Sequence, residues 1–215
     1  PGRNTITVTG NLEVATTAGS NPADAFPAYA QGENAFPLIT SDVVINSTTT
    51  GGMRAHISRN SDTPFRFFSV DADNGGRLTL RDLEFTGGNA QGRAGGVIYV
   101  RGSTTPLEAS DTVLTIFNSN FHGNNADFGG VILLDTLEGR YIRASITNSS
   151  LENNTALDGG ALINEARNGG NITLTLENSR IANNAARRAG GAIYNNPVGR
   201  NGIITITANN TDFLL

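Results

Sequence analysis

Few side chains in this sequence are of the kinds that usually carry out catalysis or bind metals. The 215 residues include two histidines, His56 and His122, and no cysteine. The absence of cysteine excludes disulfides and thiolate metal sites. All 15 basic residues are arginines, because lysine is absent as well. A site that cleaves polysaccharides would depend on carboxylates, either paired or grouped around a cation with an arginine nearby.

The carboxylates give little sign of such a site. They are scattered along the chain, and the adjacent Asp-Asp pair of polygalacturonase-like enzymes does not occur. His122-Gly123 matches one piece of that pattern, but its Arg-x-Lys partner cannot exist without lysine. We interpret both histidines as strand residues and expect Arg93 to lie near Asp127 as a weak surface pair. We predict no catalytic residue, no cofactor and no enzymatic activity.

One segment resembles the start of a calcium-binding loop. The run VDADNGG, residues 70–76, places Asp71, Asp73 and Asn74 at ligand-like spacing. However, the next ligand position is Gly75, and Asp82 replaces the bidentate glutamate that closes such loops. We interpret the segment as a polar turn and expect no metal there.

Composition favours an all-β protein that does not bind nucleic acid. The net charge is −4, so the basic surface of a nucleic-acid-binding protein is missing. Glycine is abundant and only 16% of residues are charged. No apolar stretch is long enough to span a bilayer, so we expect no membrane insertion. Turn-forming residues between short β-branched runs are typical of strands joined by tight corners.

An internal repeat is the main signal in the sequence. Five segments end in a shared polar position followed three residues later by an apolar anchor. The shared positions are Asp82, Asn118, Asn148, Asn178 and Asn210, spaced 36, 30, 30 and 32 residues apart. The anchors are Phe85, Phe121, Leu151, Ile181 and Phe213. A period near 30 with alternating apolar residues indicates stacked strands.

A second motif with the same period supports the repeat. A glycine pair follows each of the first four anchors by about ten residues, at Gly95-Gly96, Gly129-Gly130, Gly159-Gly160 and Gly190-Gly191. Between the two motifs lies a polar bend at Gly88, Asn124, Asn154 and Asn184. We expect these asparagines to tolerate left-handed backbone and to bond their neighbours in the coils above and below.

These patterns predict a right-handed parallel β-helix of roughly seven coils, with about 30 residues in each coil. We place an N-terminal strand and a capping or loop segment in residues 1–35. The β-helix itself occupies residues 36–215, and the two parts form one elongated domain.

The repeats resemble those of known bacterial surface proteins. The GGAI tetrad at 190–193 and the F-x-x-N spacing from Phe121 to Asn124 are similar to repeats of chlamydial polymorphic outer-membrane proteins. The wider run from 36 to 100 is similar to the CSLREA-type β-helix proteins of environmental bacteria, although the CSLREA motif itself is absent. The resemblance implies a right-handed parallel β-helix, secretion or display at the cell surface, and roles in adhesion or surface architecture.

Three functions stay open at this point. The first is a non-catalytic extracellular structural protein that polymerises head to tail through open β-helix ends, because no capping segment is apparent near Leu215. The second is a fragment of a larger surface adhesin that binds a glycan or protein receptor along its side. The third is a polysaccharide lyase or glycoside hydrolase, since parallel β-helices also carry such enzymes.

Overall fold

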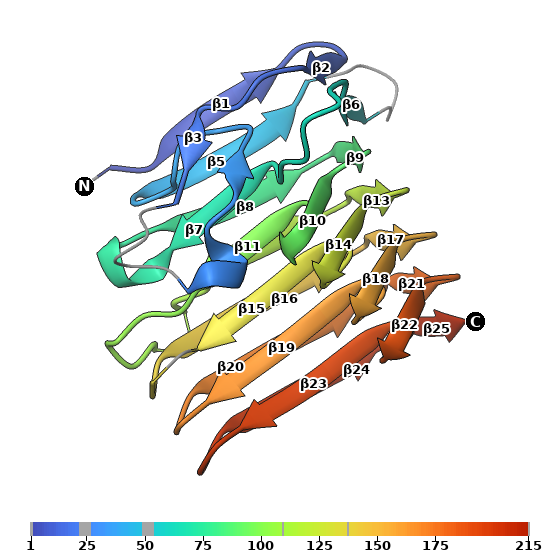
Figure 1. Ribbon diagram of the computed structural model, residues 1–215. Helices are drawn as coiled ribbons and strands as arrows, with labels where there is room; N and C mark the ends of the chain where they lie inside the picture. Colours follow the sequence, from blue (N-terminus) through green and yellow to red (C-terminus); the bar gives the residue numbers. More distant parts are fainter. Residues whose placement is uncertain (1, 22–26, 49–53, 109, 137, 215) are drawn as a thin grey trace.

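The protein is a parallel β-helix, as the repeat predicts (Figure 1). The computed structural model describes residues 2–21, 27–48, 54–108, 110–136 and 138–214. Short strands wind into about five complete turns of about 31 residues each. Within the described ranges, no helix is long and apolar enough to cross a membrane.

Four parallel sheets form the walls of the coil. The first has the order β1 (Asn4–Val8), β5 (Asp42–Ser47), β8 (Arg77–Arg81), β12 (Leu114–Phe117), β16 (Tyr141–Thr147), β20 (Asn171–Glu177), β24 (Ile203–Asn209). The second has the order β2 (Leu12–Val14), β6 (Ala55–Arg59), β9 (Leu83–Thr86), β13 (Asn120–His122), β17 (Ser150–Glu152), β21 (Arg180–Ala182), β25 (Asp212–Leu214). The seven strands in each of these sheets correspond to the seven expected levels.

The remaining parallel sheets are shorter, which is why the complete turns are fewer than seven. The third sheet has the order β7 (Phe68–Asp71), β11 (Ile98–Arg101), β15 (Ile132–Thr136), β19 (Leu162–Arg167), β23 (Ile193–Val198). The fourth has the order β10 (Asn89–Ala94), β14 (Asn125–Phe128), β18 (Thr155–Asp158), β22 (Ala185–Ala189). A small antiparallel pair joins β3 (Gly19–Ser20) to β4 (Glu33–Asn34).

The core is a continuous apolar column along the axis of the coil. The alternation of buried and outward-facing residues along the strands produces this column, because every second residue of β16 and β20 is buried. The predicted anchors pair in register across the second sheet, and the rings of Phe85 and Phe121 stack with centroids 5.3 Å apart. Phe85, Phe121, Leu151 and Ile181 are fully buried, whereas Phe213 in the last level is 47% exposed.

The N-terminal residues belong partly to the coil and partly to its side. β1 and β2 pair with β5 and β6, so the first two sheets begin there, with no break at residue 35. The short helix η1 (Ala28–Ala30) contacts β10 rather than the end of the β-helix. Ala30 packs in a small cluster with Tyr99 and Leu133 on the outer face of the third sheet. We expected a capping or loop segment here, and the described part covers a side wall.

Candidate functional site

The asparagines of the polar bend form a hydrogen-bonded ladder inside the coil. Asn124, Asn154 and Asn184 are all buried. Asn154 Nδ2 donates to Oδ1 of Asn184 and to the carbonyl oxygen of Phe121, both at 3.0 Å. Its own Oδ1 accepts from the backbone nitrogen and from Nδ2 of Asn124, also at 3.0 Å. The side-chain amide is used within the protein, which supports a structural role.

We expected left-handed backbone at these asparagines, and that prediction is wrong by one position. Left-handed backbone occurs one residue earlier, at Gly123, Asn153 and Asn183, with φ between 53° and 64°. The preceding residue makes the corner, and the ladder asparagine then directs its amide inward. Glycine or asparagine at the earlier position suits positive φ because both tolerate it.

The other asparagine column lies at the outside of the coil, and its members Asn148, Asn178 and Asn210 line a polar groove. Asn118, Asn148, Asn178 and Asn210 have φ between 46° and 51°, so they form the sharp corner between the first and second sheets. Nδ2 of Asn210 donates to Oδ1 of Asn178 at 2.8 Å. The groove has a volume of about 380 Å³ and also includes serines, Arg180 and Asp212. Its amide, hydroxyl and guanidinium groups can hydrogen-bond a polar polymer.

The glycine pairs are required because the backbones of successive coils nearly touch. The first glycine of each pair has φ between 63° and 66°. At the second glycine, space is the constraint. A Cβ on Gly96 would lie 2.1 Å from the carbonyl oxygen of Gly130, and one on Gly130 would lie 2.2 Å from that of Gly160. A side chain at either position would collide with the backbone of the next coil, so the close stacking of these coils requires glycine there.

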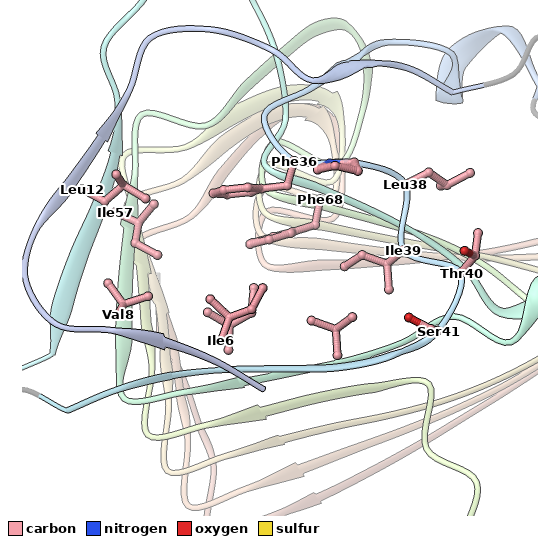
Figure 2. Close-up of a pocket in the computed structure, with 13 residues that line it drawn as sticks. Ile6, Val8, Leu12, Phe36, Leu38, Ile39, Thr40, Ser41, Ile57 and Phe68 are labelled. Atoms are coloured by element: carbon pink, nitrogen blue, oxygen red, sulfur yellow. The ribbon is translucent and has the colours of Figure 1, made fainter. Parts of the chain in front are cut away.

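The first level of the coil exposes the apolar interior (Figure 2). A pocket of about 290 Å³ opens between β1, β5 and the segment Phe36–Ser41. Figure 2 shows Ile6, Val8 and Leu12 directed toward Ile57 and Phe68 around this space. Ile6 is 52% exposed although it occupies an inward position paired with Ile45. Such an opening suits an apolar partner better than a polar ligand.

The last level exposes the same column from the opposite side. Phe213 continues the anchor positions, and Ile204 and Ile206 continue the inward positions of β20. All three keep part of their surface exposed.

No protein-family model and no curated protein sequence matches this chain. The two open ends and the polar groups along the walls are the surfaces through which this chain could act.

Two stacked carboxylates occupy the outer face of the third sheet. Asp135 and Glu165 are register neighbours on β15 and β19. Asp135 Oδ2 accepts hydrogen bonds from Tyr29 at 2.6 Å and from Tyr99 at 2.8 Å. Asp135 is only 1% exposed beneath these groups. Glu165 is 7% exposed and pairs with Arg167 at 2.5 Å. The sequence reading missed this convergence of acidic residues.

Burial changes the protonation behaviour of this face. It raises the pKa of Asp135 despite the hydrogen bonds from the two tyrosines and the nearby Arg167. Burial also raises the pKa of Glu165, against the attraction of Arg167. A raised pKa in the folded state means that the folded protein holds protons that the unfolded chain releases. The charged carboxylates therefore lower stability as the pH rises to neutrality.

We predict that acidification from pH 7 to pH 5 raises the melting temperature, and that Asp135→Asn flattens this dependence. Asparagine keeps an oxygen for the tyrosine hydroxyls and removes the buried charge. Asp73 does not interfere in this window. Burial raises its pKa, but hydrogen bonds from Thr104 and Arg140 outweigh that effect and lower the pKa to about 2. Thermal melts monitored by circular dichroism test this, and an unchanged slope in Asp135→Asn would refute the assignment.

The calcium-like segment is a polar turn held by arginines. Asp71 accepts from Arg101 Nη1 at 3.0 Å, and Asn74 Nδ2 donates to Asp71 at 2.7 Å. Asp73 pairs with Arg140 at 2.6 Å. The short helix η3 (Ala72–Asn74) forms the turn. Across the part of the chain that is described, no group of three or more histidine and carboxylate side chains could hold a metal ion.

The histidines and the surface arginines take part in local contacts. His122 bonds Glu84 at 2.6 Å, and His56 bonds Thr86 at 2.7 Å, both across neighbouring strands. The expected proximity of Arg93 and Asp127 does not produce a pair. Arg93 donates to the carbonyl oxygen of Ala28, and Asp127 accepts from the backbone nitrogen of Gly92. The N-terminal segment provides the competing acceptor for Arg93.

Sequence reasoning could have found part of the outer carboxylate face. Asp135 and Glu165 lie six residues after the first glycine of their pairs, and Arg101 holds the equivalent position in the preceding coil. Aligning that column would have shown charged residues on stacked strands. Tyr29 gave no comparable signal, because it lies outside the repeat and reaches Asp135 across 106 residues.

Proposed function

We propose that this chain is a non-catalytic extracellular structural protein, a building block of a surface fibre or adhesin that associates head to tail through its β-helix ends. One observation carries the proposal. At each end of the coil the first and second sheets have an unpaired strand edge, and both ends expose the apolar interior column. A second copy of the chain therefore fits where the first copy's coil is open.

The pairing of strands supports this arrangement. β1 and β24 are opposite edges of the first sheet, and β2 and β25 are opposite edges of the second. Their unpaired backbone groups can continue both ladders into another copy. Phe213 of one copy would then lie over Leu12 of the next copy and cover the opening that Leu12 and Ile6 line. Such a contact joins two different surfaces, so it propagates into a filament and does not close as a dimer.

The extracellular and adhesive part of the proposal has separate support. The GGAI and F-x-x-N repeats resemble those of bacterial surface proteins, which implies secretion or display. The groove along the outer asparagine column offers polar groups over several coils. A surface glycan or a protein receptor is the kind of partner that such a wall would bind, in addition to other copies of the chain.

A fragment of a larger surface adhesin is the first alternative. In that case, further coils of the same protein cover the open levels, and isolated copies need not associate. The length of the assembly in solution distinguishes the two possibilities, because only the fibre proposal requires growth with concentration.

A polysaccharide lyase or glycoside hydrolase is the second alternative, and the stacked Asp135 and Glu165 are the observation in its favour. Glycosidases use two carboxyl groups, one of which often has a raised pKa. Asp135, however, is covered by Tyr29 and Tyr99, so a glycosidic bond cannot reach its free oxygen without movement of the N-terminal segment. The closed arrangement favours a non-catalytic role. Release of reducing sugars from a polysaccharide would reverse this preference.

We predict that aspartate at either open end reduces association. Ile6→Asp and Phe213→Asp each place a charge where the next copy would bury an apolar side chain, at a cost of several kcal/mol. Multi-angle light scattering over a range of concentrations should show growing particles for the unmodified chain. Each variant should show particles of markedly lower mass at the same concentration.

The matched control is Thr155→Asp, because Thr155 is an exposed residue of β18, which has a neighbouring strand on both sides and lies away from the two ends of the coil. This variant should associate as the unmodified chain does. A chain that stays monomeric at all concentrations would favour the adhesin-fragment alternative. Equal association of all four proteins would mean that contacts elsewhere on the surface drive it.

A further inference from the structure

A pocket lies on the outer face of the first sheet, apart from the opening at the first level and from the polar groove along the outer asparagines. It has a volume of about 220 Å³ and lies between the strands β16 and β20 and the loop that follows β11. Its walls include Pro106 and Leu107 from the loop, Tyr141 and Arg143 from β16, and Asn171 and Thr173 from β20. None of these residues lines either of the other two openings.

The two strands place polar side chains at the corners of a small rectangle. Tyr141 pairs in register with Asn171, and Arg143 pairs with Thr173. The residue between them on each strand is an isoleucine buried in the core, so the four polar side chains stand on the outer face. Adjacent strands are about 4.8 Å apart, and alternate residues of one strand are about 6.6 Å apart. Four polar groups at this spacing fit around a single sugar ring.

The loop that forms the other wall is fastened to β16 near both of its ends. Tyr141 N donates to the carbonyl oxygen of Ser103 at 2.8 Å, and Ser103 N donates to that of Tyr141 at 3.0 Å. Further along the loop, Val113 N donates to the carbonyl oxygen of Arg143 at 2.9 Å. Arg143 Nε also donates to the carbonyl oxygen of Leu107 at 3.4 Å. The protein's own contacts therefore shape the pocket.

The polar groups of the pocket are not used within the described part of the protein. Nη1 and Nη2 of Arg143 make no hydrogen bond and no ion pair with the described residues, and neither nitrogen is buried. The same holds for the Tyr141 hydroxyl, the Asn171 amide and the Thr173 hydroxyl. All four side chains are partly exposed. A ligand can therefore reach them.

Arg143 is the one charged side chain among the described residues that line the pocket. The neighbouring loop carries two carboxylates, and neither of them lines the pocket. Asp111 pairs with Arg77 at 3.2 Å, and Glu108 is exposed. The positive charge of Arg143 is therefore available to an anionic group of a ligand.

We propose that this pocket binds one sugar ring that carries a carboxylate, such as a uronic acid unit of an extracellular polysaccharide. Arg143 binds the carboxylate through Nη1 and Nη2, which suits the planar guanidinium group. The side chains of Tyr141, Asn171 and Thr173 hydrogen-bond the ring hydroxyls, and Leu107 covers an apolar face of the ring. A peptide carboxylate would leave these three neutral polar groups without partners. The inference rests on the adhesive role proposed above and names its ligand, but it does not depend on association of the ends.

Calorimetric titration tests the ligand class. The probes are the methyl glycosides of glucuronic and galacturonic acid, those of glucose and galactose as uncharged counterparts, and acetyl-alanine as a carboxylate without ring hydroxyls. At least one uronide should bind about 10-fold to 100-fold more tightly than its uncharged counterpart, because the counterpart lacks the charged partner of Arg143. The same uronide should bind more tightly than acetyl-alanine. Absence of uronide binding, equal affinity for the uncharged sugar, or tighter binding of acetyl-alanine would each overturn the proposal.

Two arginine variants locate the site. Arg143→Met should weaken uronide binding by the same factor, since methionine has a similar length and no charge. Arg180→Met is the matched control, because Arg180 is a partly exposed arginine of the polar groove along the outer asparagines. It should bind the uronide as the unmodified chain does, and the opposite pattern would make that groove the site. Light scattering of the same samples separates this question from assembly, because Arg143→Met should associate normally.

A crystal soaked in the tighter-binding uronide gives a readout that needs no variant. Density for a sugar ring between Leu107 and the two strands, with its carboxylate within hydrogen-bond distance of Arg143, supports the proposal even if Arg143→Met does not fold. Density only at another place on the surface, or an empty pocket at a concentration that saturates binding in solution, would overturn it.

Discussion

Replacing Gly130 with alanine is expected to destabilise the protein strongly. The new Cβ would lie 2.2 Å from the carbonyl oxygen of Gly160 and 2.7 Å from that of Thr155. Both atoms belong to the backbone of the next coil, so no side chain can move aside. We expect a loss of about 3–5 kcal/mol in the free energy of unfolding. Urea titration monitored by circular dichroism measures it.

The matched control is Gly10→Ala. A Cβ on Gly10 meets no atom within 4 Å, and its backbone is not in the left-handed region. This variant should unfold at the same urea concentration as the unmodified chain. If Gly130→Ala were equally stable, the coils would not be stacked as closely as the fold requires, and the reason given for the glycine pairs would be wrong.

The second large effect is expected at the centre of the buried asparagine ladder. Asn154→Ala removes four hydrogen bonds and takes the shared acceptor away from the backbone nitrogen and Nδ2 of Asn124. Unsatisfied buried polar groups cost about 1–3 kcal/mol each. We therefore expect a loss of about 3 kcal/mol and a melting temperature lower by about 6–12 °C. Differential scanning calorimetry measures both quantities.

The control for the ladder is Asn209→Ala, since Asn209 is exposed on the last strand of the first sheet. It should melt within about 2 °C of the unmodified chain, as surface substitutions usually do. A similar loss in both variants would show that asparagine content, and not the buried ladder, sets the stability.

The repeat allowed the fold to be predicted because each coil uses the same residues for the same physical task. Phe121 and Leu151 are apolar anchors at matching positions, and they pair in register as expected. The glycine pairs and the bend asparagines also mark the same corner in each coil. Periodicity predicts which residues are neighbours across coils. The ladder of Asn124, Asn154 and Asn184 could therefore be predicted from the sequence.

The rest depends on contacts that have no period. Tyr29 and Arg66 meet the third sheet because a nonrepeating segment folds back over it, and their spacing in the sequence contains no sign of this. The left-handed corners were assigned one residue late, since Asn153 and Asn154 have the same side chain and only the backbone distinguishes them. The carboxylates Asp135 and Glu165 lie 30 residues apart in the sequence, and only their pairing in register on β15 and β19 brings them together.

Engineered cysteines test the head-to-tail contact most directly, because the chain contains no cysteine of its own. Thr5 and Thr207 are exposed, outward-facing residues of β1 and β24. They belong to one column, in which Thr5 pairs with Val44 and Thr207 pairs with Thr175. A second copy that continues the first sheet in register places Thr5 beside Thr207, within the Cα separation that a disulfide needs.

The double variant Thr5→Cys, Thr207→Cys should therefore give a ladder of dimers, trimers and longer species on a non-reducing gel after mild oxidation. The pair Ser145→Cys, Thr207→Cys is the control, because Ser145 lies in the same column in the middle of the coil. It should give no ladder. Exclusively monomeric Thr5→Cys, Thr207→Cys, or equal ladders from both pairs, would contradict end-to-end association.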